Sequence, residues 1–277
     1  MSGRIWALVA AAVAAWLSLG AGGAFASVTL GRTAPPSSSC GVSDDLLQPT
    51  TTGNSYVAQG GGTITSWSTY GPASGSGSAK LKVFRKVSAT RYSVVTQDVF
   101  RTISSPGPFT RNVTIGGVQA GDVIGLTVTG LSGCVFSAPP GDRYLLRAGD
   151  LSNGAAGDFS TSSPNFGVNV SAVLDPSHKF TIGATTRHKN KGTATLSVDF
   201  PGPGRVTLSG KGVKGAGQPI TVAGSGALGL LIKATGSKRA TLFDRGKVTL
   251  NLGLSYTPTG GTAGTGATKV KLKKRLG

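Results

Sequence analysis

The sequence predicts an all-β protein made of two β-sandwiches behind a cleaved signal peptide. Apolar and polar residues alternate along most of the chain, which is the pattern of half-buried strands. The 277 residues include 44 Gly and 14 Pro, so turns are frequent, and there is little helical patterning. The roughly 250 residues after the signal peptide suit two domains of ordinary size.

The first 26 residues have the layout of a secretory signal peptide. Arg4 precedes an apolar run over residues 5–17, and Ala24-Phe25-Ala26 forms an A-x-A cleavage site. The run is too short to span a bilayer about 30 Å thick, so we expect no transmembrane anchor after cleavage. We expect a mature protein that begins at residue 27 and is secreted, with association with the cell wall as a further possibility.

Cys40 and Cys134 are the two cysteines of the chain. An even number of cysteines in an exported protein predicts a disulfide, with two free thiols as the alternative. Closing a loop of this length stabilises a fold by about 4–5 kcal/mol in the chain-entropy treatment.

The expected domains are residues 27–175 and 176–277, divided where Pro176 coincides with a change in charge density. The second domain shows seven alternating segments, the number typical of an immunoglobulin-like sandwich. They lie near residues 178–183, 193–200, 205–210, 219–223, 228–234, 247–256 and 268–273. The longer first domain indicates a jelly-roll-like sandwich. Its clearest strands are expected at residues 64–67, 80–84, 93–99, 112–115, 123–128 and 166–173.

Several stretches resemble modules of exported actinobacterial proteins. In the first domain they are residues 62–68, 80–85, 118–126, Cys134 and 170–174, which resemble a β-sandwich domain of such proteins. In the second they are residues 192–198, 201–204, 208–213, 256–261 and the Lys-rich end, which resemble a cationic, fibronectin-like module. Related chains often carry acidic calcium-binding repeats between the two domains. Asp175-Pro176-Ser177 here leads straight into the second domain, so the resemblance implies no calcium-stiffened linker.

The charge is concentrated in the second domain. Residues 176–277 contain 17 Lys or Arg and 2 Asp, a net of +15, whereas residues 27–175 contain 10 basic and 8 acidic residues, a net of +2. Arg4 supplies the last unit of the formal charge of +18. A charge confined to one half of a chain points to a polyanionic partner for that half.

The last expected strand carries a row of lysines. Lys269, Lys271 and Lys273 alternate and should project from one face, and Lys274 and Arg275 extend the cluster. Outside a cell the natural partners are anionic wall polymers or acidic polysaccharide. Such binding would be electrostatic and would weaken as the salt concentration rises. Protection of an edge strand from aggregation is the alternative. Nucleic acid is not the expected partner, because the protein is expected to be exported and because no aromatic residues alternate with these basic residues.

Trp67 and Tyr70 form the second candidate site. A Trp and a Tyr three residues apart can present a stacking platform for a sugar ring. A single Trp in a strand also commonly fills a core. If Ile64 faces inward, strict alternation turns Trp67 outward, which favours the platform.

Signals for catalysis and cofactors are weak. The chain has no Glu, so a glycosidase would need two Asp as its carboxylate pair. Asp142, Asp150 and Asp158 lie in Gly-containing loops, where they close turns, bind calcium or supply the acid of a hydrolase. No G-x-S-x-G elbow is present, and His178 and His188 are too sparse for a metal triad.

Residues 210–215 and 224–229 both fit G-x-G-x-x-G, but no helical pattern follows to hold a pyrophosphate. We expect no cofactor or metal. We therefore expect a non-catalytic exported protein of the cell envelope, with a ligand-recognising first domain, for which carbohydrate is one candidate ligand, and a cationic second domain. A secreted hydrolase acting on polysaccharide or cell wall and a purely structural spacer stay open as alternatives.

Overall fold

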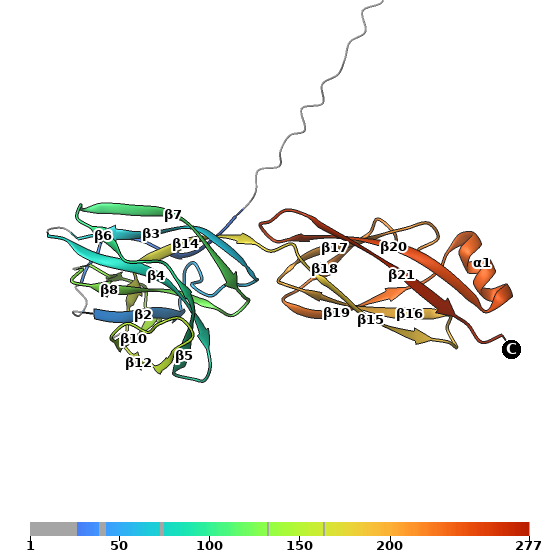
Figure 1. Cartoon of the computed structure of the whole chain (residues 1–277), viewed down its shortest axis with the longest axis horizontal. Coiled ribbons are helices and arrows are strands. Elements are labelled where there is room, and N and C mark those ends of the chain that lie inside the picture. Colours follow the sequence, from blue (N-terminus) through green and yellow to red (C-terminus); the bar gives the residue numbers. More distant parts are fainter. Residues whose placement is uncertain (1–26, 39–42, 73–74, 132, 163, 277) are drawn as a thin grey trace, which may run out of the picture.

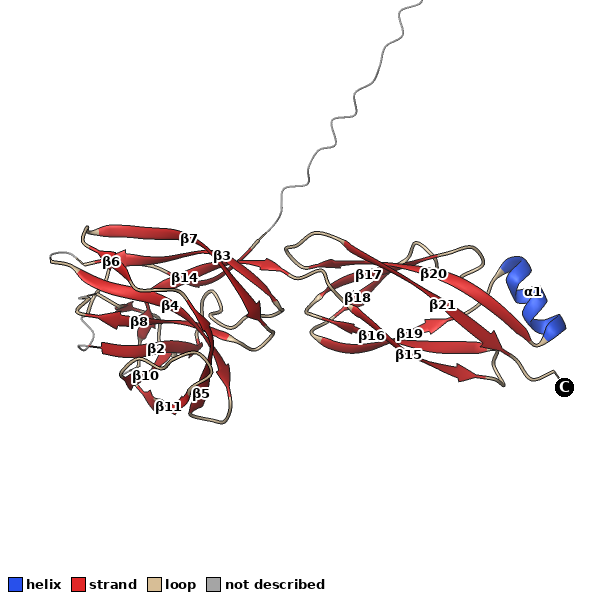
Figure 2. Ribbon diagram, in the orientation of Figure 1, coloured by secondary structure: helices blue, strands red, loops and turns tan. Residues whose placement is uncertain are grey.

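The computed structural model describes residues 27–38, 43–72, 75–131, 133–162 and 164–276. The expected signal peptide and Cys40 lie outside these residues. The described chain consists of strands and one helix, α1 (Gly236–Arg245), so the prediction of an all-β fold is confirmed. Two sandwiches lie end to end along the longest axis, and α1 lies at the far end of the second one (Figure 1, Figure 2).

The first sandwich is a jelly roll. One sheet has the order β1 (Val28–Arg32), β14 (Val170–Pro176), β3 (Gly62–Gly71) and β7 (Gly107–Val118). The facing sheet has the order β11 (Ala156–Asp158), β5 (Arg91–Gln97), β4 (Gly77–Lys86), β8 (Val123–Thr129), β2 (Ser43–Thr50), β10 (Arg143–Ala148) and β12 (Ser160–Thr161). β6 (Arg101–Ile103) pairs with β4, and β9 (Val135–Ser137) pairs with β13 (Phe166–Val168). Most successive long strands alternate between the two sheets, as in a jelly roll of two Greek keys.

The central strands β4 and β8 are covered on both faces. Leu81 and Val83 of β4 belong to the core between the sheets. On the other face of β4, Phe84 meets the ring of Phe159 edge-on at 5.5 Å, and the Lys82 ammonium donates to the carbonyl of Leu151. The loop at residues 149–155 and the side chain of Phe159 therefore form a lid over the outer face of this sheet, which explains how lysines of β4 become buried.

The second sandwich has seven strands in two sheets. The first sheet has the order β15 (Thr181–His188), β16 (Thr193–Phe200) and β19 (Gly226–Ile232). The second has the order β18 (Pro219–Val222), β17 (Gly204–Ser209), β20 (Lys247–Pro258) and β21 (Gly264–Lys273). Each strand overlaps one of the seven expected segments, and the alternation is clearest in β20, which buries every second residue from Val248 to Tyr256. The first segment was expected near residues 178–183, whereas β15 begins only at Thr181 and continues to His188.

Several elements were not expected from the sequence. α1 buries only Leu242, so it has almost no amphipathic pattern, although Gly246 ends it in the left-handed conformation at φ 64°. Strands such as β9, β11 and β12 have two or three residues, too few to show alternation. β2 begins Ser-Asp-Asp, and its buried Asp45 hides the strand pattern.

Main-chain contacts join the two sandwiches. The Gly61 N–H donates to the Pro201 carbonyl at 2.8 Å, and the Ser177 N–H donates to the Gly61 carbonyl at 2.8 Å. A Cβ atom on Gly202 would lie 2.7 Å from the Cα of Gly60, closer than side chains tolerate. The two main chains at the junction therefore approach each other so closely that only glycine fits at this position.

Candidate functional site

The sugar-stacking platform expected at Trp67 is wrong. Trp67 is 0% exposed, its Nε1 donates to Asp98 Oδ2 at 2.9 Å, and its ring lies 5.7 Å from that of Phe109. Tyr70 is half-buried. The ring of Trp67 therefore offers no face to a sugar.

A β-bulge is the reason that alternation failed here. Ile64 is also fully buried, three residues before Trp67. On β14, Val173 pairs with Ser66 and the next residue pairs with Ile64, so Thr65 is an extra residue on β3. The bulge shifts the side-chain parity by one, and both Ile64 and Trp67 face the core.

Cys134 lies in the core of the first sandwich, 0% exposed, and is not a free thiol. Its expected partner Cys40 lies outside the described residues. The Cys40–Cys134 pairing stays a prediction.

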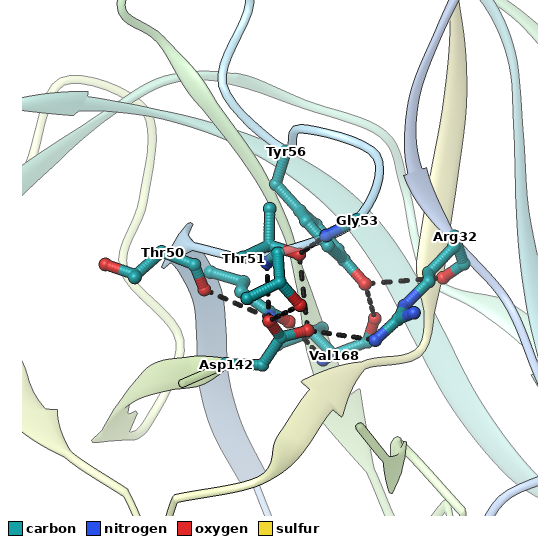
Figure 3. A network of polar contacts seen from close by, with 9 residues as sticks. Arg32, Thr50, Thr51, Gly53, Tyr56, Asp142 and Val168 are labelled. Carbon is teal, nitrogen blue, oxygen red and sulfur yellow. Dashed lines mark hydrogen bonds and ion pairs between the residues drawn. The ribbon is translucent and has the colours of Figure 1, made fainter. Parts of the chain in front are cut away.

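Asp142 is the centre of a buried polar network (Figure 3). Its Oδ2 accepts from Arg32 Nη2 at 2.9 Å and from Thr51 Oγ1 at 3.3 Å, and its Oδ1 accepts from the Thr52 N–H at 2.6 Å. Beside it, the Tyr56 hydroxyl donates to the Val168 carbonyl at 2.7 Å, and burial raises the pKa of Tyr56. Asp142 thus fastens the strand end at Arg32 to the turn at residues 51–52.

Asp150 and Asp158 are also held by cations. Asp150 accepts from the ammonium groups of Lys80 at 2.8 Å and Lys82 at 2.7 Å. Burial opposes ionisation of Asp150, but these two hydrogen bonds prevail and lower its pKa. Asp158 pairs with Arg91 at 2.8 Å. Within the described residues, no group of three or more His, Cys, Asp or Glu is placed to hold a metal ion.

The two sandwiches differ sharply in how their charges are paired. In the first, six of the eight Asp form ion pairs with Lys or Arg. Among the described residues of the second sandwich, one pair is present, between Arg245 and Asp244 at 3.7 Å, and both side chains are exposed. Most cations of the second sandwich therefore face solvent without a carboxylate partner.

The expected lysine row lies on β21, an edge strand. Lys269, Lys271 and Lys273 are exposed, while the residues between them are buried. Lys273 lies directly opposite Lys247 of β20. Like charges at opposed positions destabilise a sheet, so this pairing has no benefit for folding. Arg187 of β15 donates to the Lys271 carbonyl at 2.9 Å, which brings a further cation to the row.

The other two residues of the cluster lie just past β21. The backbone N–H of Arg275 donates to the Lys189 carbonyl at 3.0 Å, so the end of the chain is tied to the loop after β15. The Lys274 ammonium lies 4.8 Å from the ring centroid of Phe243 on α1. The cationic surface therefore continues from β21 onto the α1 end of the sandwich.

At that end lies a pocket of about 540 Å³, which we call the α1 pocket. Its cationic lining consists of Lys191, Lys214, Lys233 and Arg239, with His188 beside them, and its lining contains no Asp. The sequence does not reveal this pocket, because its lining residues come from four separate segments. One local signal was available for part of it. Arg239 and Phe243 are four residues apart, the spacing of neighbours on one helix face, and Gly246 is a typical helix end.

The remaining motifs hold no site. Residues 210–215 lie between β17 and β18, and residues 224–229 lead into β19, so both glycine patterns precede strands instead of a helix. His178 and His188 lie apart, and His188 Nε2 is 2.9 Å from Thr195 Oγ1. A larger hollow of about 710 Å³ lies at the junction and mixes Asp175 and Asp199 with His178 and Lys179.

The described part of the chain contains no helix with the length and apolar character of a membrane span. No family model and no curated protein matches the chain. Among solved structures it is similar to the GH2 beta-galacturonidase from Eisenbergiella tayi bound to galacturonate, at 12% identity with a TM-score of 0.22. The alignment covers 88% of this chain and 43% of the enzyme, so the chain spans less than half of that protein. A likeness at this TM-score carries no functional argument.

Proposed function

We propose that the second sandwich binds anionic polymers of the cell envelope, such as wall polymers that carry phosphate or carboxylate groups. The observation that carries the proposal is the scarcity of negative charge to balance the cations. Residues 176–277 contain 17 Lys or Arg and only 2 Asp, and one weak ion pair is present between described residues. Such a surface attracts polyanions over about 8–10 Å at physiological salt.

Edge protection alone does not account for the cations. The outer edge of β21 needs only its own lysines for that purpose. The second sandwich also places Lys247 opposite Lys273, Arg187 beside Lys271, and four cations around the α1 pocket. This spread supports a role in binding.

The first sandwich is the compact, charge-balanced body of the protein in this proposal. Asp142, Asp150 and Asp158 each have cationic partners, which favours a structural role for them over a role as the acid of a hydrolase. The signal peptide expected in residues 1–26 would bring the chain to the envelope. Trp67, the residue expected to recognise a ligand in this sandwich, is buried and cannot contact one from solvent.

The test measures retention of the purified protein on cell-wall material across a salt series. The decisive variant replaces Lys269, Lys271 and Lys273 by Gln. A matched control replaces three exposed cations of the first sandwich by Gln, namely Lys86, Arg111 and Arg143. Both variants lose the same net charge, so they separate a local surface from overall charge.

We expect retention to fall with salt, and the β21 variant to lower the log–log salt slope by about 2 to 3 through loss of up to three anion contacts. The control should keep nearly the parent slope. Equal losses in both variants would contradict a defined surface, and no retention at low salt would overturn the proposal.

A further inference from the structure

The α1 pocket differs from the rest of the cationic surface because large apolar side chains are exposed among its cations. Leu231 of β19 is 51% exposed and Phe243 of α1 is 48% exposed, and both line the pocket. A surface that binds only hydrophilic polyanions gains nothing from exposed apolar side chains. The combination calls for a partner that is both anionic and apolar.

The geometry keeps Phe243 and its cations together. Arg239, one turn earlier on α1, has its guanidinium carbon 5.3 Å from the Phe243 ring centroid, and the Lys274 ammonium lies 4.8 Å from it. Each distance is within the range of a cation–π contact. The aromatic ring and two positive charges are therefore presented as one unit at the end of the molecule.

The pocket supplies the matching polar part. Lys191, Lys214 and Lys233 line it together with Arg239, and its lining contains no Asp. Basic residues near an anionic bilayer contribute attraction, while apolar side chains enter the boundary between headgroups and acyl chains. Lysines can keep their ammonium groups at the headgroups while their stems cover apolar surface.

We propose that the α1 end of the second sandwich binds the surface of an anionic phospholipid bilayer. Headgroup phosphates occupy the cationic pocket, and Phe243 and Leu231 enter the interfacial layer. This binding goes beyond the polymer association proposed above, because it adds an apolar component and is confined to the α1 end of the cationic surface. Lys274 contributes to both surfaces.

Co-sedimentation of the full protein with two kinds of vesicle tests this proposal. One kind contains phosphatidylcholine with phosphatidylglycerol, and the other contains phosphatidylcholine alone. The diagnostic variant is Phe243→Ser. Its matched control is Phe100→Ser in the first sandwich, since Phe100 is 41% exposed and also has a lysine ammonium, that of Lys80, 4.5 Å from its ring centroid.

We expect the protein to bind the phosphatidylglycerol vesicles and not the neutral ones. Phe243→Ser should weaken vesicle partitioning about tenfold through loss of apolar burial, whereas Phe100→Ser should not change it. Replacement of Lys214 and Lys233 by Gln should also weaken partitioning and reduce its salt dependence. Thermal unfolding of each variant checks that the fold is kept.

Retention on a polyphosphate resin separates this proposal from polymer binding. Phe243→Ser should be retained like the parent protein, because the resin offers no apolar phase. Absence of vesicle binding at low salt, or vesicle binding that Phe243→Ser leaves unchanged, would overturn the bilayer proposal while leaving polymer association untouched. Equal loss on resin and vesicles would also overturn it.

Discussion

Lys82 and Asp45 form an ion pair in which both side chains are 0% exposed, with Nζ 2.7 Å from Oδ1. The Lys82 ammonium also donates to Asp150 and to the Leu151 carbonyl, both at 2.7 Å. Asp45 accepts from Thr127 Oγ1 at 2.6 Å as well. This satisfied network lies under the lid formed by residues 149–155 and Phe159, and it fastens that lid to β2, β4 and β8.

Removal of the cation should strongly destabilise the first sandwich. Lys82→Met leaves the Asp45 carboxylate buried without its cation, and we expect the free energy of unfolding to fall by about 3–5 kcal/mol. Urea unfolding followed by circular dichroism measures this change. The control Arg91→Met breaks the exposed pair with Asp158 and should lower stability by less than about 1 kcal/mol.

A double variant separates charge burial from packing. Addition of Asp45→Asn to Lys82→Met removes the uncompensated charge, so it should restore more than half of the lost stability. A double variant as unstable as Lys82→Met alone would show that packing, and not the ion pair, sets the stability at this position.

Trp67 reports directly on the bulge in β3. It is the only Trp in residues 27–277 and it is fully buried, so its fluorescence in a protein produced from residues 27–277 should be blue-shifted and resistant to iodide quenching. Stern–Volmer quenching before and after urea unfolding measures its accessibility. Strong quenching in the folded protein would contradict the core position and revive the stacking platform.

Asp98 should make stability depend on acid pH. Burial opposes its ionisation, but hydrogen bonds from Arg101, from Trp67 and from the Val99 N–H prevail and lower its pKa below the ordinary 3.8. The unfolded chain therefore binds a proton at a higher pH than the folded protein does. The stability that Asp98 provides is complete above about pH 4 and is lost as the pH falls through the folded-state pKa.

Urea unfolding at a series of pH values tests this dependence. We expect Asp98→Asn to be less stable than the parent at pH 7 and to lose less stability below about pH 4. Parallel curves for the two proteins would show that Asp98 does not contribute to the acid sensitivity.

The glycines at the junction should control how the two sandwiches are held together. A side chain on Gly202 would press on the Cα of Gly60, so Gly202→Val should loosen the junction and speed tryptic cleavage after the exposed Lys179. Gly224→Val is the matched control, since no heavy atom lies within 4 Å of its Cβ position. Equal cleavage rates in both variants would contradict the importance of this contact.

The second sandwich could be read from the sequence because its signals are local. Alternation appears along its longer strands, such as β16 and β20, and Lys269, Lys271 and Lys273 share a face as a consequence of the strand period. In the first sandwich, the bulge at Thr65 changes which side chains of β3 face the core, and no local sequence pattern indicates that bulge. Asp45 has the residue type of a surface position, and its burial depends on the ion pair with Lys82, which is distant in sequence.

The sequence by itself determined the all-β class, the seven strands of the second sandwich and the concentration of positive charge in that half. These properties depend on residue type and on spacing along one strand. Only the tertiary structure decided that Trp67 is buried, that Lys82 and Asp45 neutralise each other, and that the α1 pocket gathers cations from four segments. Such properties arise from contacts between distant segments, and no local pattern encodes those contacts.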